Sequence, residues 1–104
     1  MKTLITSTGP ETEARMDPRF GRAAFFCLYD HQTGDIAFIQ NEFRDAQGGA
    51  GTKVAEKVLQ MNAGRVISGD FGPKAKELLD KFEIQLVKYN DDQKTIAEII
   101  DSIK

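Results

Sequence analysis

The chain has 104 residues, of which 40% are hydrophobic and 29% are charged, and its formal net charge is -2 at pH 7. This length suffices for one hydrophobic core, so we expect a single domain over residues 1–104. The charge balance excludes a chain-wide basic surface, and we expect no nucleic-acid partner. With no signal-peptide pattern and no apolar run near the roughly 20 residues of a membrane span, we expect a cytoplasmic protein without a membrane partner.

The first half of the chain is predicted to form strands. The run at residues 23–29 is apolar at both odd and even positions, which is typical of a strand covered on both faces. The connection before it exceeds the usual length of about 4–6 residues, so it is either functional or partly disordered. Gly34 can adopt a positive φ in the hairpin turn that follows. The strands predicted in this half lie at residues 3–7, 23–29 and 36–39.

The second half alternates helices with strands. Gly64 is expected at the C-cap of the first helix and Pro73 at the first position of the second. Asp91 or Asp92 is expected at the N-cap of the third helix. Strands are predicted at residues 65–68 and 84–87. The apolar helix faces, read from their helical spacing, are Val54, Ala55, Val58 and Leu59; Ala75, Leu78, Leu79 and Phe82; and Ile96, Ile99, Ile100 and Ile103.

The element order β-β-β-α-β-α-β-α predicts an α/β fold. Short helical connections and the right-handed crossover rule place the last two strands parallel to the first strand. The two hairpin strands then lie on the other side of the first strand. We therefore expect a three-layer α/β/α arrangement with a mixed five-stranded sheet and helices on both faces.

Residues 16–23 carry the strongest functional signal in the chain. A proline and a glycine shape the backbone there, and Phe20 can anchor the loop on the core. Arg19 and Arg22, opposed nearby only by Asp17, leave positive charge that suits a carboxylate, a phosphate or another oxyanion. The stretch therefore predicts an anion-binding loop. The alternative is a solvated connection anchored by its phenylalanine.

This loop is expected to meet other glycine-rich segments at one rim of the sheet. Ligands of open α/β sheets bind beyond the carboxyl ends of the parallel strands, where free N–H groups and positive helix ends attract anions. Residues 69–72 follow a parallel strand, and residues 49–51 open a helix. The alternative for residues 69–72 is a tight turn from strand to helix. The alternative for residues 49–51 is a flexible segment that leads into the helix. The predicted anion site comprises Arg19, Phe20, Gly21, Arg22, Gly49, Ala50, Gly51, Gly69, Asp70, Phe71 and Gly72.

Soft metal ligands are scarce in this sequence. The single cysteine, Cys27, excludes an internal disulfide and lies mid-strand, where we expect a buried hydrophobe. Met16 is the one candidate thioether ligand at the rim, although a loop methionine is more often incidental. His31 is expected to be exposed on a hairpin tip at the opposite pole. Because no nucleophile has a base at recognisable spacing, we predict a protein that is not an enzyme.

Several motifs together carry a family resemblance. The most specific is Arg19-Phe20-Gly21-Arg22, and the others are Asn41 and the segments 49–51, 62–64 and 69–75. This set resembles the dinitrogenase iron-molybdenum cofactor biosynthesis family over nearly the whole chain. The resemblance implies a ribonuclease-H-like fold without nuclease activity. It also implies a role like that of nitrogenase accessory proteins, which bind iron-molybdenum cofactor or its iron-sulfur precursor and pass it between partners.

The residues and the resemblance lead to one functional prediction. We expect a non-catalytic carrier whose cargo is an anionic metallocluster, such as iron-molybdenum cofactor or an iron-sulfur cluster, with cofactor-assembly proteins as partners and no permanent cofactor. Some family members have histidine before the Phe-Gly pair, whereas this chain has Arg19, so no imidazole–metal bond is expected there. The alternative is a sensor or regulatory module that binds a small organic or phosphate anion at the same rim.

Overall fold

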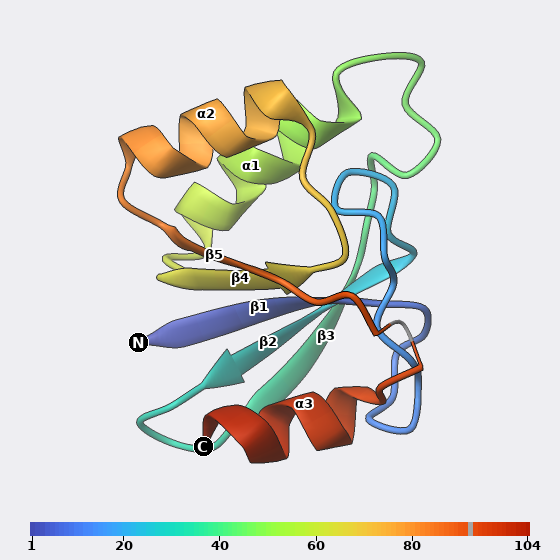
Figure 1. Cartoon of the computed structure of the whole chain (residues 1–104), viewed down its shortest axis with the longest axis vertical. Helices are drawn as coiled ribbons and strands as arrows, with labels where there is room; N and C mark the ends of the chain where they lie inside the picture. Colours follow the sequence, from blue (N-terminus) through green and yellow to red (C-terminus); the bar gives the residue numbers. More distant parts are fainter. Residues whose placement is uncertain (92) are drawn as a thin grey trace.

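A five-stranded sheet forms the middle layer of the molecule, in a computed structural model that describes residues 1–91 and 93–104. Its strand order is β3-β2-β1-β4-β5, with β1, β4 and β5 parallel and β2 antiparallel to both of its neighbours. Helices α1 and α2 cover one face and α3 covers the other (Figure 1). The predicted three-layer α/β/α arrangement with a mixed five-stranded sheet is confirmed. The elements are β1 (Lys2–Ser7), β2 (Phe25–Asp30), β3 (Ile36–Gln40), α1 (Ala50–Gln60), β4 (Arg65–Ser68), α2 (Pro73–Lys81), β5 (Gln85–Lys88) and α3 (Ile96–Ile103).

The central strands bury side chains on both faces of the sheet. In β2, Phe26 belongs to the core beneath α1 and α2, whereas Cys27 belongs to the core beneath α3. Leu4 and Ile5 divide β1 in the same way. This double burial explains why residues 23–29 are apolar at both odd and even positions. Within the described chain, no helix combines the length and the apolar character that a bilayer crossing requires.

The ends of α1 and α2 differ from the predictions. The left-handed residue after α1 is Asn62, with φ of 58°, so the prediction of Gly64 as the C-cap was wrong. Asparagine tolerates this conformation better than most residues with a Cβ. Helix α2 ends at Lys81, and Phe82 is 53% exposed because it leaves the helical path. The prediction that Phe82 contributes to a buried helix face was therefore also wrong.

Helix α3 begins with a complete capping box. The Thr95 hydroxyl accepts a hydrogen bond from the Glu98 amide at 3.2 Å, and the Glu98 carboxylate accepts one from the Thr95 amide at 3.1 Å. Thr95 therefore replaces Asp91 as the N-cap, and Asp91 instead accepts from the amide of Gln93 at 3.0 Å. The other predicted cap, Asp92, lies outside the described residues.

The start of α3 is also tied to the long N-terminal connection. The amides of Ile96 and Ala97 donate to the carbonyls of Ala14 and Thr12, both at 2.9 Å. The Met16 amide donates to the Lys94 carbonyl at 3.0 Å. These bonds order the connection that follows β1, so the prediction of partial disorder there does not apply.

Candidate anion-binding site

The loop over residues 17–23 takes its shape from one buried carboxylate. Asp17 is 1% exposed, and its Oδ1 accepts hydrogen bonds from the Arg19 amide at 3.0 Å and from Arg19 Nε at 3.1 Å. Its Oδ2 accepts from Arg19 Nη2 and from the Ala24 amide, both at 3.2 Å. The hydrogen bond and the charge of Asp17 raise the pKa of Arg19. Asp17 therefore fixes both the backbone of the loop and the position of its first arginine.

Two glycines let this loop touch its neighbours backbone to backbone. A Cβ at Gly21 would lie 2.7 Å from the Gly51 nitrogen at the start of α1. A Cβ at Gly69 would lie 2.6 Å from Pro18 Cα and 2.7 Å from the Pro18 carbonyl oxygen. The loop is therefore held between the first turn of α1 and the segment that follows β4. Segments distant in sequence meet at the end of the sheet where α1 and α2 begin (Figure 1).

Asn41 supports the same loop from the end of β3. Its Nδ2 donates to the Gly21 carbonyl at 3.0 Å and to the Ala23 carbonyl at 2.9 Å. Its Oδ1 accepts from the Phe43 amide at 3.0 Å. The sequence pointed to Asn41 only through the family resemblance, and its supporting role was missed. The available signal was an asparagine directly after a predicted strand, because asparagine side chains at such positions often hydrogen-bond to backbone groups of irregular segments.

A cavity of about 450 Å³ opens between the loop and the starts of α1 and α2. Every predicted site residue lines it except Gly69, which packs against Pro18, and Phe71, whose ring lies 5.3 Å from that of Phe20. Gly69 and Phe71 therefore contact the loop without lining the cavity. The binding role of the predicted residues stays a prediction. The lining also includes first-turn residues that were not predicted as site residues, Thr52, Pro73, Lys74 and Ala75.

Both helices at the cavity begin without a side-chain cap. Gly49 and Gly72 occupy the N-cap positions, and neither helix has an acidic residue in its first turn. Helix α3, by contrast, is capped by Thr95 and Glu98. Uncapped helix starts present free N–H groups and a partial positive charge, which suit an anion. Among residues 1–91 and 93–104, first-turn amides at the cavity that donate to no protein acceptor are those of Ala50, Gly51, Thr52, Lys74 and Ala75.

The two arginines of the cavity are partly engaged within the protein. Arg19 pairs with Asp17 and keeps its side chain 52% exposed. Arg22 Nη1 donates to the carbonyls of Arg44 at 2.9 Å and Ala46 at 2.6 Å. The sequence predicted that both guanidinium groups contribute to an anion site, opposed nearby only by Asp17. In the structure each also holds a loop in place, so only part of its donors remain for a ligand.

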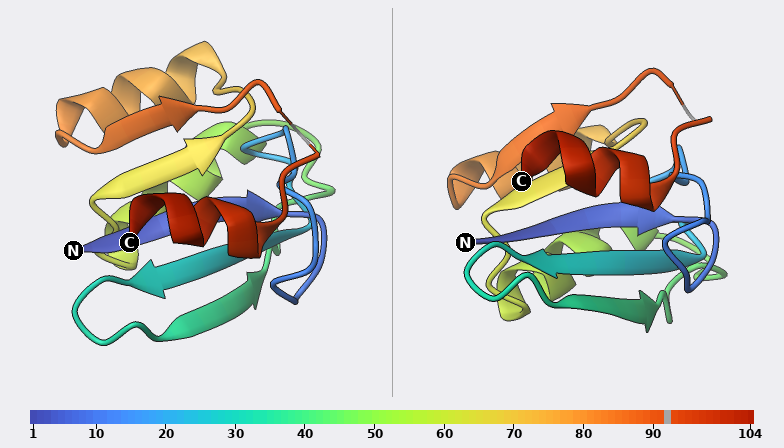
Figure 2. Two further views of the ribbon diagram at one scale, coloured as in Figure 1. Left: turned by 60° about the horizontal axis from the view of Figure 1, so that its bottom comes forward. Right: turned by 90° about the horizontal axis from the view of Figure 1, so that it is seen from below.

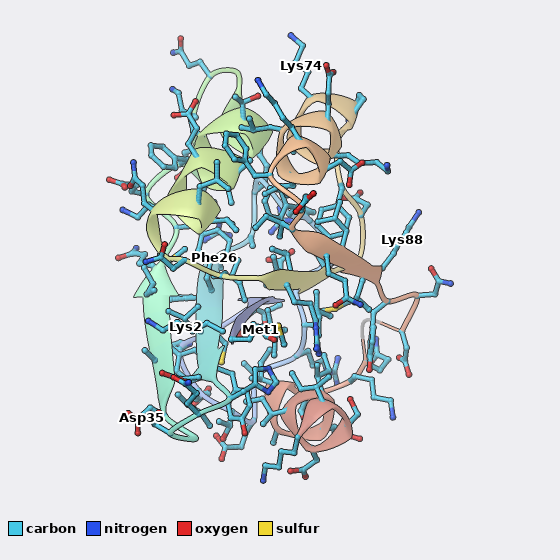
Figure 3. The ribbon with its side chains drawn as sticks, turned by 90° about the vertical axis from the view of Figure 1, so that its left-hand side faces the viewer. Met1, Lys2, Phe26, Asp35, Lys74 and Lys88 are labelled. Atoms are coloured by element: carbon cyan, nitrogen blue, oxygen red, sulfur yellow. The ribbon has the colours of Figure 1, made fainter. Side chains whose placement is uncertain are left out.

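The cavity lies at the pole opposite the two chain ends. Both views of Figure 2 show the N- and C-termini at one end of the sheet, and the connection after β1 and the segments that lead into α1 and α2 at the other. Figure 3 looks at the molecule from the terminal side, with Met1 and Lys2 near the centre and Lys74 at the outer edge of α2. The predicted convergence of the loops at the carboxyl ends of the parallel strands is thus confirmed.

The candidate soft ligands lie away from the cavity. Met16 is 1% exposed in the core beneath α3, so its expected position at the rim was wrong. His31 is only partly exposed, because its Nε2 lies 2.7 Å from Thr3 Oγ1 at the far end of β2. Burial and the charge of Arg65 lower the pKa of His31. No group of three or more His, Cys, Asp or Glu side chains in the described part of the chain could hold a metal.

Cys27 is a core residue, as predicted. It is fully buried, and burial raises the pKa of its thiol to about 12. We expect the folded protein to react with 5,5′-dithiobis(2-nitrobenzoate) near pH 8 at least about 100-fold more slowly than the protein unfolded in urea, because little thiolate forms and the sulfur is shielded. The release of nitrothiobenzoate measures this rate. A folded protein that reacts as fast as the unfolded one would contradict the burial of Cys27.

The cavity and fold can be compared with known proteins. The chain matches the family described as dinitrogenase iron-molybdenum cofactor over residues 1–104. It is 30% identical over 84 residues to the uncharacterized protein MJ0580 of Methanocaldococcus jannaschii, a match covering 78% of this chain and 71% of the relative.

Solved structures show the same similarity. The apo form of the orange protein from Desulfovibrio gigas matches with a TM-score of 0.87 and 28% identity, covering 98% of this chain and 85% of that protein. A putative NifB protein from Thermotoga matches with a TM-score of 0.82 and 26% identity, covering 98% of this chain and 85% of that protein. The family match over the whole chain confirms the resemblance predicted from the motifs. The chain therefore belongs to the dinitrogenase iron-molybdenum cofactor family.

Proposed function

We propose that this protein is a non-catalytic carrier for an anionic metallocluster, either iron-molybdenum cofactor or an iron-sulfur precursor, within metallocofactor assembly. The observation that carries the proposal is the meeting of two uncapped helix starts and two arginines around one cavity. The family match supports the class of cargo. The cofactor-assembly proteins that deliver and receive this cargo are the proposed partners.

The hydrogen-bond donors around the cavity can bind the outer atoms of such a cluster. Sulfide and carboxylate groups at the surface of a cluster accept hydrogen bonds, and backbone amides with guanidinium groups supply them. Cys27, Met16 and His31 all lie elsewhere, so the cluster would keep its own metal ligands. Hydrogen bonds and ion pairs can be released without breaking a metal–protein bond. This reversibility suits a protein that accepts a cargo and passes it on.

A sensor or regulatory module for a small anion is the second candidate. The observation that favours it is the chemistry of the lining, because amide and guanidinium donors bind carboxylates and phosphates as well as sulfides. Titration of the metal-free protein with inorganic phosphate and with citrate, set beside anaerobic titration with cluster, distinguishes the two functions. Stabilisation by such an anion, together with no uptake of cluster, would favour the sensor.

We expect the double variant Arg19→Ala, Arg22→Ala to bind isolated iron-molybdenum cofactor at least about tenfold more weakly than the wild type. The variant loses two charge-assisted contacts with the ligand, and the free energy of one such contact already corresponds to about a tenfold change in affinity. Anaerobic titration followed by absorbance and gel filtration measures the uptake.

The double variant Arg15→Ala, Arg44→Ala is the matched control. Both of these arginines are exposed and their side chains lie outside the cavity, yet the change in net charge is the same. Equal uptake by the two double variants, or no uptake by the wild type, would count against the carrier.

A further inference from the structure

One acidic residue, the exposed Asp70, lines a cavity whose other charged residues are cationic. Asp70 lies in the segment between β4 and α2 and shares the lining with Arg19, Arg22 and Lys74. Within the part of the chain that the structure describes, the Asp70 carboxylate accepts no hydrogen bond and forms no ion pair. Asp17, the other carboxylate of this region, is buried and fully engaged. Asp70 is therefore a free acceptor beside a set of free donors.

A free carboxylate in an anion site works against a ligand that only accepts hydrogen bonds. Such a ligand would bring negative charge close to Asp70, and like charges at short range repel. A ligand that also carries a hydrogen-bond donor reverses this effect, because its donor can bond to the carboxylate. Hydrogen bonds to charged groups are among the stronger ones in proteins.

We infer that Asp70 makes the cavity selective for anions that present a hydrogen-bond donor, such as a hydroxyl group, among their acceptor atoms. This inference rests on the proposed function, because it assumes that the cavity binds an anion. The amides of α1 and α2 and the cationic side chains hold the acceptor atoms of the ligand. The Asp70 carboxylate then accepts a hydrogen bond from that donor, so otherwise similar anions that lack the donor bind more weakly.

Asp70 also has a purely structural explanation. It lies two residues before the N-cap Gly72, where a negative charge interacts favourably with the start of α2. In that case replacing Asp70 would lower the thermal midpoint without changing which anion binds. The experiment therefore needs a measure of selectivity as well as a measure of stability.

Citrate and tricarballylate form a suitable probe pair, because they carry the same carboxylates and differ by one hydroxyl group. We expect isothermal titration near pH 8, where both are fully ionised, to show that the wild type binds citrate about tenfold more tightly than tricarballylate. In Asp70→Ala this ratio falls to about one, in part because tricarballylate binds more tightly. Glu77→Ala, which removes an exposed carboxylate of α2 outside the cavity, should keep the ratio of the wild type.

The outcomes separate this inference from the proposed function. If the wild type binds the two anions equally, or if Asp70→Ala keeps the preference for citrate, the inference is overturned while the anion site stands. If neither anion binds to any of the three proteins, both the anion site and the selectivity are rejected. If Asp70→Ala has a lower thermal midpoint but the same ratio of citrate to tricarballylate affinity as the wild type, Asp70 has only the structural role.

Discussion

Replacing Asp17 with alanine is expected to lower the free energy of unfolding by about 2–4 kcal/mol and to weaken anion binding at least about tenfold. The substitution leaves the Ala24 amide without an acceptor in a buried position. It also frees the Arg19 amide and the Arg19 guanidinium from the same carboxylate. The loop over residues 17–23 then loses its defined shape, and the cavity loses one wall.

Urea unfolding monitored by circular dichroism measures the change in stability, and titration with citrate measures the change in binding. Asp45→Ala is the matched control, because it removes an exposed carboxylate on a neighbouring loop. We expect the control to shift the free energy of unfolding by less than about 0.5 kcal/mol. An Asp17→Ala protein as stable as this control would show that the carboxylate does not hold the loop.

Replacing Gly69 with alanine is expected to cost about 1–3 kcal/mol of stability and to displace the loop from the cavity. The new Cβ would lie 2.6 Å from Pro18 Cα, and the atoms in its way belong to the backbone and the ring of Pro18. Neither can rotate aside as a flexible side chain could. The loop must therefore move away from β4, carrying Arg19 and Phe20 with it.

Gly72→Ala gives the comparison within the same segment. No atom lies within 4 Å of a Cβ built at Gly72, and its φ of -64° is open to alanine. We expect the stability of this variant to stay within about 0.5 kcal/mol of the wild type, because alanine restricts the unfolded chain but is a poorer N-cap than glycine. If Gly69→Ala and Gly72→Ala unfold at the same urea concentration, the close approach of Gly69 to Pro18 is refuted.

The fold could be predicted because its signals are local. The double apolar pattern of residues 23–29 indicated a strand buried on both faces, and Phe26 and Cys27 enter opposite cores. The end of α2 could not be read in this way. Phe82 continues the helical spacing of Leu78 and Leu79, yet the helix ends one residue earlier. The spacing of apolar residues indicates which face of a helix is buried, but it does not indicate the residue at which the helix ends.

The site was predicted in outline and not in its interactions. Glycines at positions 49–51 and 69–72 indicated a close approach, but the sequence could not say to what. Gly69 approaches Pro18 rather than the cavity. From the sequence, Asp17 was interpreted only as a negative charge opposing the arginines. In the structure both of its carboxylate oxygens accept backbone hydrogen bonds that shape the loop. Such roles depend on backbone directions within an irregular loop, for which sequence has no periodic signal.

The bonds between α3 and the first long connection have a consequence for the order of synthesis. The carbonyls of Thr12 and Ala14 accept hydrogen bonds from α3, and the Met16 amide donates to the Lys94 carbonyl. The segment that leads into Asp17 is therefore anchored by Lys94 and the start of α3. A nascent polypeptide still inside the ribosomal exit tunnel lacks this anchor. Anion binding at the cavity is therefore expected to begin only after α3 has been synthesised and has docked, since the loop that forms one wall of the cavity is anchored through these bonds.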